Sequence, residues 1–205
     1  MNTESIINNK KIILDNFNKG KYEKVIKLGK KFLKKNNDFQ VLYVLGVANL
    51  TLKDYLEAEK TFRKITSLKP NAENYYIYGN IHKQLKNYNE ASEYFLKAIN
   101  LKSDYSEAYN NLGNTKFKLG FIDEAVKNYK QAIKFNKKNI SAYFNLAHVY
   151  SEEKNFDNLK KVLQDILKFD ENNTTALNDL GYLNLILGSV DEGRKLFERV
   201  INIDD

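Results

Sequence analysis

The sequence predicts an all-α protein made of about six antiparallel helix pairs, and three observations support this prediction. Residues 72–105 and 106–139 repeat one pattern at an interval of 34 residues. A constant period of about 20 to 50 residues indicates one small structural unit stacked on copies of itself. Within each copy, apolar residues recur every three or four positions, as they do in amphipathic helices. With one Pro and nine Gly in 205 residues, the chain also lacks the turn density of an all-β protein.

The positions that align between the two central copies hold aromatic or small residues. The aligned pairs are Tyr75 with Tyr109, Gly79 with Gly113, Ala91 with Ala125, Phe95 with Tyr129, and Ala98 with Ala132. Small residues allow two helices to approach closely. We therefore interpret the recurring Gly and Ala as packing positions without a chemical role.

Residues 6–38 form a weakened copy of the same unit. A first helix is expected around residues 5–18, Gly20 marks a turn, and Tyr22, Val25 and Phe32 follow at helical spacing. Lysines crowd the second helix of this copy. The outer face of a terminal repeat meets water and not another repeat, so a degenerate sequence is expected there.

The remaining copies fill the chain without a linker. Residues 39–71 are one residue short and end near Pro70, the only proline, which cannot continue a helix. No separate capping helix is expected after the last copy. The sequence thus predicts a single array over residues 1–205, with repeats at approximately 6–38, 39–71, 72–105, 106–139, 140–173 and 174–205.

Each unit is expected to be a helix-turn-helix whose second helix begins with a polar residue. The residues near these starts are Asp54, Asn89, Asp123, Asp157 and Asp191. Their side-chain oxygens could accept hydrogen bonds from the first free backbone N–H groups, and the carboxylates also favour the positive end of the helix dipole.

Composition excludes several classes of protein. The absence of cysteine removes disulfides, thiolate zinc sites and cysteine nucleophiles. No apolar run approaches the roughly 20 residues that a membrane-spanning helix needs. The first residues, MNTESIINNKK, lack the long apolar region of a signal peptide. We therefore expect a cytoplasmic protein.

The net charge of +7 is distributed unevenly. Residues 1–38 carry ten Lys and four acidic residues, whereas residues 140–205 carry seven basic and twelve acidic residues. Lysines on solvated helix faces explain most of this excess. Arg occurs at only three positions and no nucleic-acid recognition motif is present, so we do not expect a nucleic acid partner.

The repeats resemble those of the tetratricopeptide repeat (TPR) family, whose 34-residue unit carries the pattern W-x2-L-G-x2-Y, then A-x3-F, then P. YNNLGNTKF and EAVKNYKQA in residues 109–132 match this pattern, with Tyr109 in place of the Trp, and the Pro is kept only at Pro70. The resemblance covers almost the whole chain. It implies a right-handed superhelical solenoid whose first helices line a concave face where partner peptides lie.

On this resemblance, first-helix residues that packing does not use are candidates for a peptide groove. They are Tyr76, Asn80, Asn110, Asn111, Asn114, Phe144, Asn145, His148, Asp179 and Tyr182. An Asn amide both donates and accepts hydrogen bonds, so several in a row could pair with the backbone of an extended peptide.

Asn80, Asn111, Asn114 and Asn145 resemble the asparagine ladder in the repeats of O-linked N-acetylglucosamine transferase. Asn is abundant throughout this chain, however, and compositional bias is an equally good explanation of its presence in the groove. A second binding mode of the family holds acidic C-terminal tails with basic residues. It is not expected here, because Tyr76, Ser141 and Asn145 stand where those basic residues would be.

No catalytic, cofactor or metal site is predicted. His82 and His148 are the only histidines, and they fall in different repeats without a matching set of acids or cysteines. We expect His82 to pack between helices and His148 to face the groove. The glycines occur singly at turns, not in a phosphate-binding cluster.

The last repeat carries apolar residues that an extra helix would normally cover. Leu196, Phe197, Val200 and Ile201 are expected to include a face without a partner inside the chain, and each such exposed side chain costs about 1.5–3 kcal/mol. A second copy of the chain, attracted head to tail by the opposite charges of the two ends, is one candidate to cover this face. A following domain is another, if the coding sequence continues beyond Asp205.

We therefore predict a non-enzymatic scaffold that binds an extended peptide or protein segment in its groove. Two alternatives stay open. The chain could be the substrate-recognition region of a larger enzyme such as a protein glycosyltransferase or sulfotransferase, or it could assemble head to tail with itself.

Overall fold

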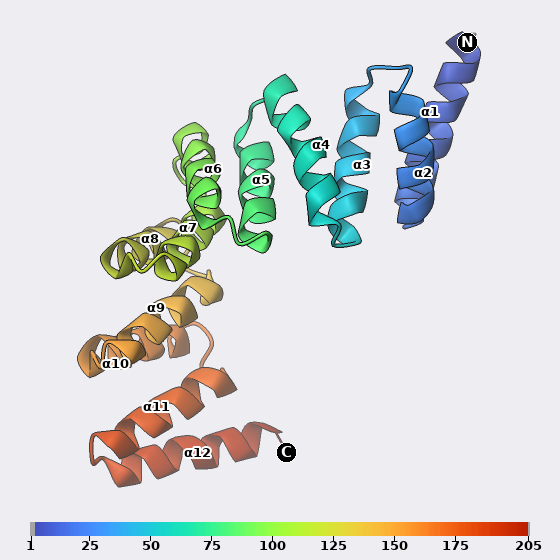
Figure 1. Ribbon diagram of the computed structural model, residues 1–205. Helices are drawn as coiled ribbons and strands as arrows, with labels where there is room; N and C mark the ends of the chain where they lie inside the picture. The colour runs from blue at the N-terminus through green and yellow to red at the C-terminus, as the bar shows by residue number, and fades with distance from the viewer. Residues whose placement is uncertain (1–2, 205) are drawn as a thin grey trace. The chain divides into compact units, whose positions relative to one another are not determined.

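The computed structural model describes residues 3–204, and helices occupy most of this range (Figure 1). Within the described residues the chain forms twelve α-helices joined by short turns. They are α1 (Thr3–Asn18), α2 (Tyr22–Leu33), α3 (Phe39–Thr51), α4 (Tyr55–Leu68), α5 (Ala72–Gln84), α6 (Tyr88–Leu101), α7 (Ser106–Lys118), α8 (Ile122–Phe135), α9 (Ile140–Glu152), α10 (Phe156–Leu167), α11 (Thr174–Ile186) and α12 (Val190–Asp204). The predicted all-α class and the succession of six helix pairs are confirmed.

The helices divide into two compact units of three pairs each. Unit 1 (Met1–Ser103) contains α1 to α6, and unit 2 (Asp104–Asp205) contains α7 to α12. Inside each unit, every helix packs against the next one in the sequence. This nearest-neighbour packing is the contact pattern of a stacked repeat.

A small residue on the first helix of a pair faces a large residue 16 positions later on the second helix. A Cβ atom added at Gly113 would lie 2.6 Å from Cε1 of Tyr129, and one added at Gly79 would lie 2.8 Å from the ring of Phe95. Gly46 meets Phe62 and Gly181 meets Phe197 in the same way. In the remaining pair of unit 2 the first-helix residue is Ala147, and the residue 16 positions later is the smaller Leu163. The volume of one partner thus compensates for that of the other.

The turn inside every helix pair passes through one residue with a positive φ angle. Three of these residues are glycines and three are lysines: Gly20, Lys53, Lys86, Gly120, Lys154 and Gly188. The next N–H reaches back over five residues to a carbonyl of the first helix, as in the 2.9 Å bond from Asn87 N to His82 O. This is the Schellman ending of a helix, in which glycine is the preferred residue because it lacks a Cβ atom. The repeat geometry therefore holds even where lysine replaces glycine.

The predicted caps of the second helices are mostly wrong. Asp54 does cap α4 and accepts a hydrogen bond from Glu57 N. Asp123, Asp157 and Asp191 lie one residue inside their helices, where their carboxylates still favour the positive helix end. Asn89 likewise lies inside α6 and does not cap it. Side-chain caps occur instead at the starts of four first helices and of α10, at Asp38, Asn71, Asn139, Asn173 and Asn155.

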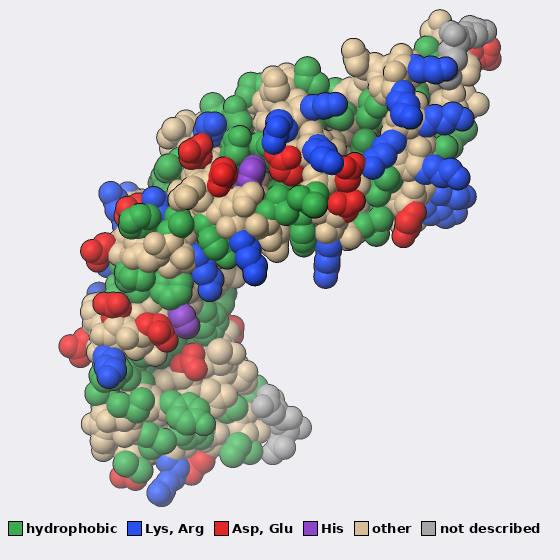
Figure 2. Space-filling view, viewed as in Figure 1, with side chains coloured by type: hydrophobic (Ala, Val, Ile, Leu, Met, Phe, Trp, Pro, Cys, Tyr) green, Lys and Arg blue, Asp and Glu red, His purple; other side chains and the backbone are tan. Residues whose placement is uncertain are grey.

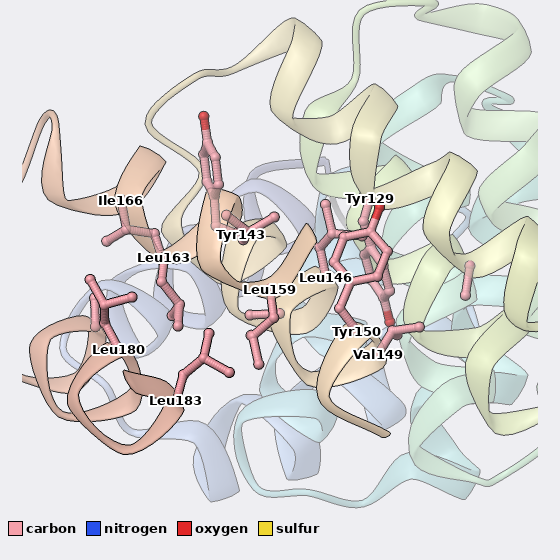
Figure 3. Close-up of a cluster of buried hydrophobic side chains, with 14 residues drawn as sticks. Tyr129, Tyr143, Leu146, Val149, Tyr150, Leu159, Leu163, Ile166, Leu180 and Leu183 are labelled. Carbon is pink, nitrogen blue, oxygen red and sulfur yellow. The ribbon is translucent and has the colours of Figure 1, made fainter. Parts of the chain in front are cut away.

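Each unit has its own apolar interior. In unit 2, side chains of α8 to α11 form a continuous buried cluster that includes Tyr129, Leu146, Leu163 and Leu183 (Figure 3). Unit 1 holds one cluster around Ile13 in α1 to α3, and a second that joins α4 to α5.

The surface of unit 1 carries a concentration of lysine over α1 and α2 (Figure 2). It reflects the ten Lys and four acidic residues of residues 1–38. Among the helices that the structure describes, none is long and apolar enough to cross a membrane.

Candidate peptide-binding groove

A groove of about 430 Å³ lies in unit 2 between α9 and α11, with α10 contributing to its floor. Its polar side chains are His148, Ser151, Asp179 and Tyr182. The other residues that line it are Phe144, Ala147, Phe156, Leu159, Leu183 and Ile186. The volume falls within the range of about 300–1,000 Å³ that is typical of ligand pockets.

The repeat period explains why these side chains lie together. Phe144, His148 and Ser151 follow one another on α9 at helical spacing, and Asp179, Tyr182 and Ile186 do so on α11. Residues separated by 34 positions occupy equivalent places, so Asp179 corresponds to Asn145 and Tyr182 corresponds to His148. Four of the ten residues predicted for the groove, Phe144, His148, Asp179 and Tyr182, line this one site.

Leu159 and Leu183 connect the groove to the hydrophobic interior of unit 2. Both belong to the buried cluster shown in Figure 3, and both also line the groove. The floor therefore rests on tightly packed side chains. Such support favours a site that is formed before a ligand binds.

Aromatic contacts position the polar rings at the rim. The His148 ring packs edge-on against Phe117 of α7, with 5.4 Å between ring centroids. Tyr182 packs edge-on against Phe197 of α12, with 5.2 Å between centroids. Both His148 and Tyr182 are nonetheless exposed, and 63% of Tyr182 is accessible to solvent.

Asp179 is the charged side chain of this groove. Loss of water beside the groove walls raises the pKa of its carboxyl above the ordinary value of 3.8, although Asp179 as a residue is exposed to solvent. Among the described residues, none forms a hydrogen bond or an ion pair with its side chain. The groove thus holds a carboxylate whose loss of hydration is not compensated by a cation.

The asparagines predicted for the ladder are partly occupied by bonds inside unit 2. Asn145 Nδ2 donates to Asn110 Oδ1 at 2.9 Å, and this bond connects α9 to α7. The Tyr129 hydroxyl donates to Asn114 Oδ1 at 2.8 Å. Asn111, which lies between Asn110 and Asn114 in the sequence of α7, is half-buried. Each amide has two donors and two acceptor lone pairs, so these bonds leave further capacity at Asn110, Asn114 and Asn145.

The two remaining predicted groove residues lie in unit 1, on α5. Tyr76 is half-buried, and its ring centroid is 6.0 Å from that of Phe95. Asn80 is also half-buried and lies one turn further along the same face of α5.

The prediction that Leu196, Phe197, Val200 and Ile201 include an unpartnered face needs correction for three of these residues. Phe197 packs against Gly181 and Tyr182, Leu196 packs against the interior of unit 2, and Val200 is buried. The helical repeat turns these side chains toward α11 or the interior. Ile201 alone stays largely exposed, at 60%.

The two histidines lie in different surroundings. His82 is buried on α5, whereas His148 is exposed at the groove. Within residues 3–204, no group of three or more His, Cys, Asp or Glu side chains is arranged to hold a metal ion.

Six of the ten lining residues were not among the predicted site residues: Ala147, Ser151, Phe156, Leu159, Leu183 and Ile186. Ser151 and Ile186 occupy the last turns of α9 and α11, and Phe156 begins α10. The spacing of seven residues from Phe144 to Ser151 and from Asp179 to Ile186 places each pair on one helix face, and this signal could have identified Ser151 and Ile186.

Comparison with protein-family models supports the repeat assignment. Models described as TPR repeat match residues 79–120 and 114–153, and models described as tetratricopeptide repeat match residues 39–71 and 140–173. A search of curated protein sequences finds no match.

Several solved structures share the fold. PilF from Pseudomonas aeruginosa is 18% identical, with a TM-score of 0.73 over 98% of this chain and 92% of that protein. MamA from Desulfovibrio magneticus is 21% identical, with a TM-score of 0.71 over 81% of this chain and 93% of that structure. YrrB, described as a TPR protein with an unusual peptide-binding site, is 18% identical, with a TM-score of 0.64 over 85% of this chain and 90% of its own. The family models, the repeat period and the paired helices together show that this chain belongs to the tetratricopeptide repeat family.

Proposed function

We propose that this protein is a non-enzymatic scaffold that binds an extended segment of a protein partner along the first helices of unit 2. The observation that carries the proposal is the groove between α9 and α11, where Phe144, His148, Asp179 and Tyr182 line a single site. Its floor is apolar and a few polar groups stand at fixed places, which is the usual composition of a ligand site. The description of YrrB as having a peptide-binding site is in keeping with this proposal.

The asparagines of α7 and α9 would bind the backbone of the partner segment. Asn110 and Asn145 are held by their mutual hydrogen bond, so their amides are already oriented and lose little freedom on binding. Because an amide pairs with any peptide group, this part of the site would hold the segment without reading its sequence. The groove at α11 would then supply the preference for particular side chains.

The test begins with peptides selected on the immobilised full chain from a random library displayed on phage. The affinity of a selected peptide is then measured by fluorescence anisotropy for the wild type and for the double variant Asn111→Ala, Asn145→Ala. We expect the double variant to bind at least about tenfold more weakly, since each lost hydrogen bond contributes about 0.5–1.5 kcal/mol.

Stability must be followed in parallel, because Asn145 also bonds to Asn110. Loss of this half-buried bond should lower the melting temperature by only about 2–4 °C. The matched control is Asn100→Ala with Asn202→Ala, two exposed asparagines on the second helices α6 and α12. Equal peptide affinity in the groove variant and in this control would contradict the role of the asparagines.

A further inference from the structure

The charge of the groove comes from one side chain. Among the ten described residues that line it, Asp179 is the only acidic residue, and none is Lys or Arg. Asp179 occupies the place that Asn145 and Asn111 hold in the two preceding repeats. Asp and Asn have nearly the same shape, so this replacement adds a negative charge without changing the outline of the site.

The Asp179 carboxylate has no hydrogen-bond or ion-pair partner among the described residues, and the groove walls displace part of its water although the residue itself is exposed. A charge in such surroundings is stabilised when a cation takes the place of the lost water. The net negative charge of the surrounding repeats also favours a cationic ligand, because residues 140–205 carry twelve acidic and seven basic residues. An excess of acidic groups raises the local concentration of cationic ligands.

The walls beside Asp179 suit the stem of a long cationic side chain. Phe144, Phe156 and Ile186 are apolar, and Tyr182 presents an exposed aromatic ring. The methylene groups of Lys or Arg can lie along such a surface while the charged end reaches a carboxylate. The guanidinium group of Arg also stacks on aromatic rings and forms paired hydrogen bonds with a carboxylate.

We propose that this groove selects partner peptides that place an arginine or lysine side chain at Asp179. The cationic end would pair with the Asp179 carboxylate, and the stem would lie against Tyr182 and the apolar wall. This inference rests on the proposed function and specifies which segments unit 2 prefers. An acidic residue at the same point would bring two negative charges together and would be rejected.

A direct test uses two small probes on the full chain, followed by ¹H–¹⁵N NMR. The probes are N-acetyl-arginine methylamide and its neutral near-isostere N-acetyl-citrulline methylamide. We expect the arginine probe to shift the amide signals of His148, Asp179 and Tyr182. The citrulline probe should bind about twofold to fivefold more weakly, because an ion pair with an exposed carboxylate contributes up to about 1 kcal/mol.

Asp179→Asn should remove the difference between the two probes. The control variant Glu198→Gln makes the same change of charge at an exposed position on α12, outside the groove, and should keep the difference. Equal binding of both probes to the wild type, an undiminished preference in Asp179→Asn, or the absence of shifts at these three residues would each overturn the proposal.

The phage selection separates this inference from the proposed function. Peptides selected by the wild type should be enriched in Arg and Lys, and those selected by Asp179→Asn should not. Selected peptides without this enrichment would refute the cation preference while leaving peptide binding intact. If no peptide is selected although the arginine probe still binds at Asp179, the scaffold function fails and the groove is a site for a small cation.

Discussion

At the scale of single residues, His82 is a titratable side chain enclosed by aromatic rings. Its ring is buried on α5 and stacks on Tyr94, with 5.3 Å between centroids, while Tyr78 packs on its edge. Within the described part of the chain, neither ring nitrogen has a hydrogen-bond partner. Burial lowers the pKa of His82 below its ordinary value of 6.5, and the nearby Glu59 and Glu90 oppose this effect only in part. Burial in the folded protein therefore favours the neutral form of this imidazole.

This environment predicts an acid sensitivity of unit 1. Above a pH of about 6.5 His82 is neutral in both the folded and the unfolded chain, and its titration costs no stability. As the pH falls below that value, the unfolded chain binds the proton first, so the free energy of unfolding decreases. Urea unfolding at about pH 8 and about pH 5.5 should show this loss, and His82→Phe should show a smaller one.

Two acidic residues of unit 1, Glu57 and Glu59, do not contribute to the expected loss of stability between about pH 8 and about pH 5.5. Hydrogen bonds from Lys30 and Lys60 lower the pKa of Glu57 from 4.5 to about 2, so Glu57 contributes to the pH dependence only at more acidic values. Burial would raise the pKa of Glu59, but hydrogen bonds from Tyr78 and Arg63 outweigh it and lower the pKa. A variant of the exposed histidine, His148→Gln, serves as the control. If His82→Phe keeps the full loss of stability between the two pH values, His82 is not its source.

At the scale of the helix pair, the match between one small and one large residue determines how closely two helices pack. Gly79 with Phe95 and Ala147 with Leu163 are two solutions to the same spacing of 16 residues. Protein interiors have few voids, so a change of one methyl group at such a contact is felt. The stability of a pair should therefore depend on the combination and not on either residue alone.

Gly79→Ala tests this dependence. The added methyl group would lie 2.8 Å from the Phe95 ring and should destabilise unit 1 by about 1–3 kcal/mol. Phe95→Leu alone should also destabilise it, because it leaves a cavity. Combined, the two substitutions recreate the Ala and Leu pairing and should cost less than their sum, with a coupling of about 0.5–3 kcal/mol in urea unfolding. Strictly additive losses would show that the ring does not meet this glycine.

The helix pair also shows which features can be predicted from sequence. The positions of Gly79 and Phe95 follow from the repeat period, because packing repeats with the backbone geometry. The turn residues Lys53, Lys86 and Lys154 could not be recognised as left-handed, since lysine has no preference for positive φ and only the surrounding helix ends impose it. Caps were misplaced by a residue or two, and neither α6 nor α8 has a side-chain cap at all, since the N-cap residue of α8 is Phe121 and Asn87 at the start of α6 makes no capping hydrogen bond.

At the scale of the whole molecule, the groove was only partly predictable. The period of 34 residues identified His148 and Tyr182 as equivalent and placed them on first helices. It could not show that Asn145 is bonded to Asn110, or that Phe197 turns inward under Tyr182. These contacts depend on side-chain directions between neighbouring helices, which a pattern along one chain does not contain. The charge gradient, basic in residues 1–38 and acidic in residues 140–205, is by contrast a property of the sequence itself.

The central claim is that unit 2 holds its partner on the first helices, over the groove between α9 and α11. A crystal structure of the full chain with a peptide selected from the random library tests it most directly. The account predicts an extended peptide that contacts Phe144, His148 and Tyr182, with a basic side chain at Asp179. A peptide bound instead to the outer faces of the second helices α10 and α12, with this groove empty, would contradict the account.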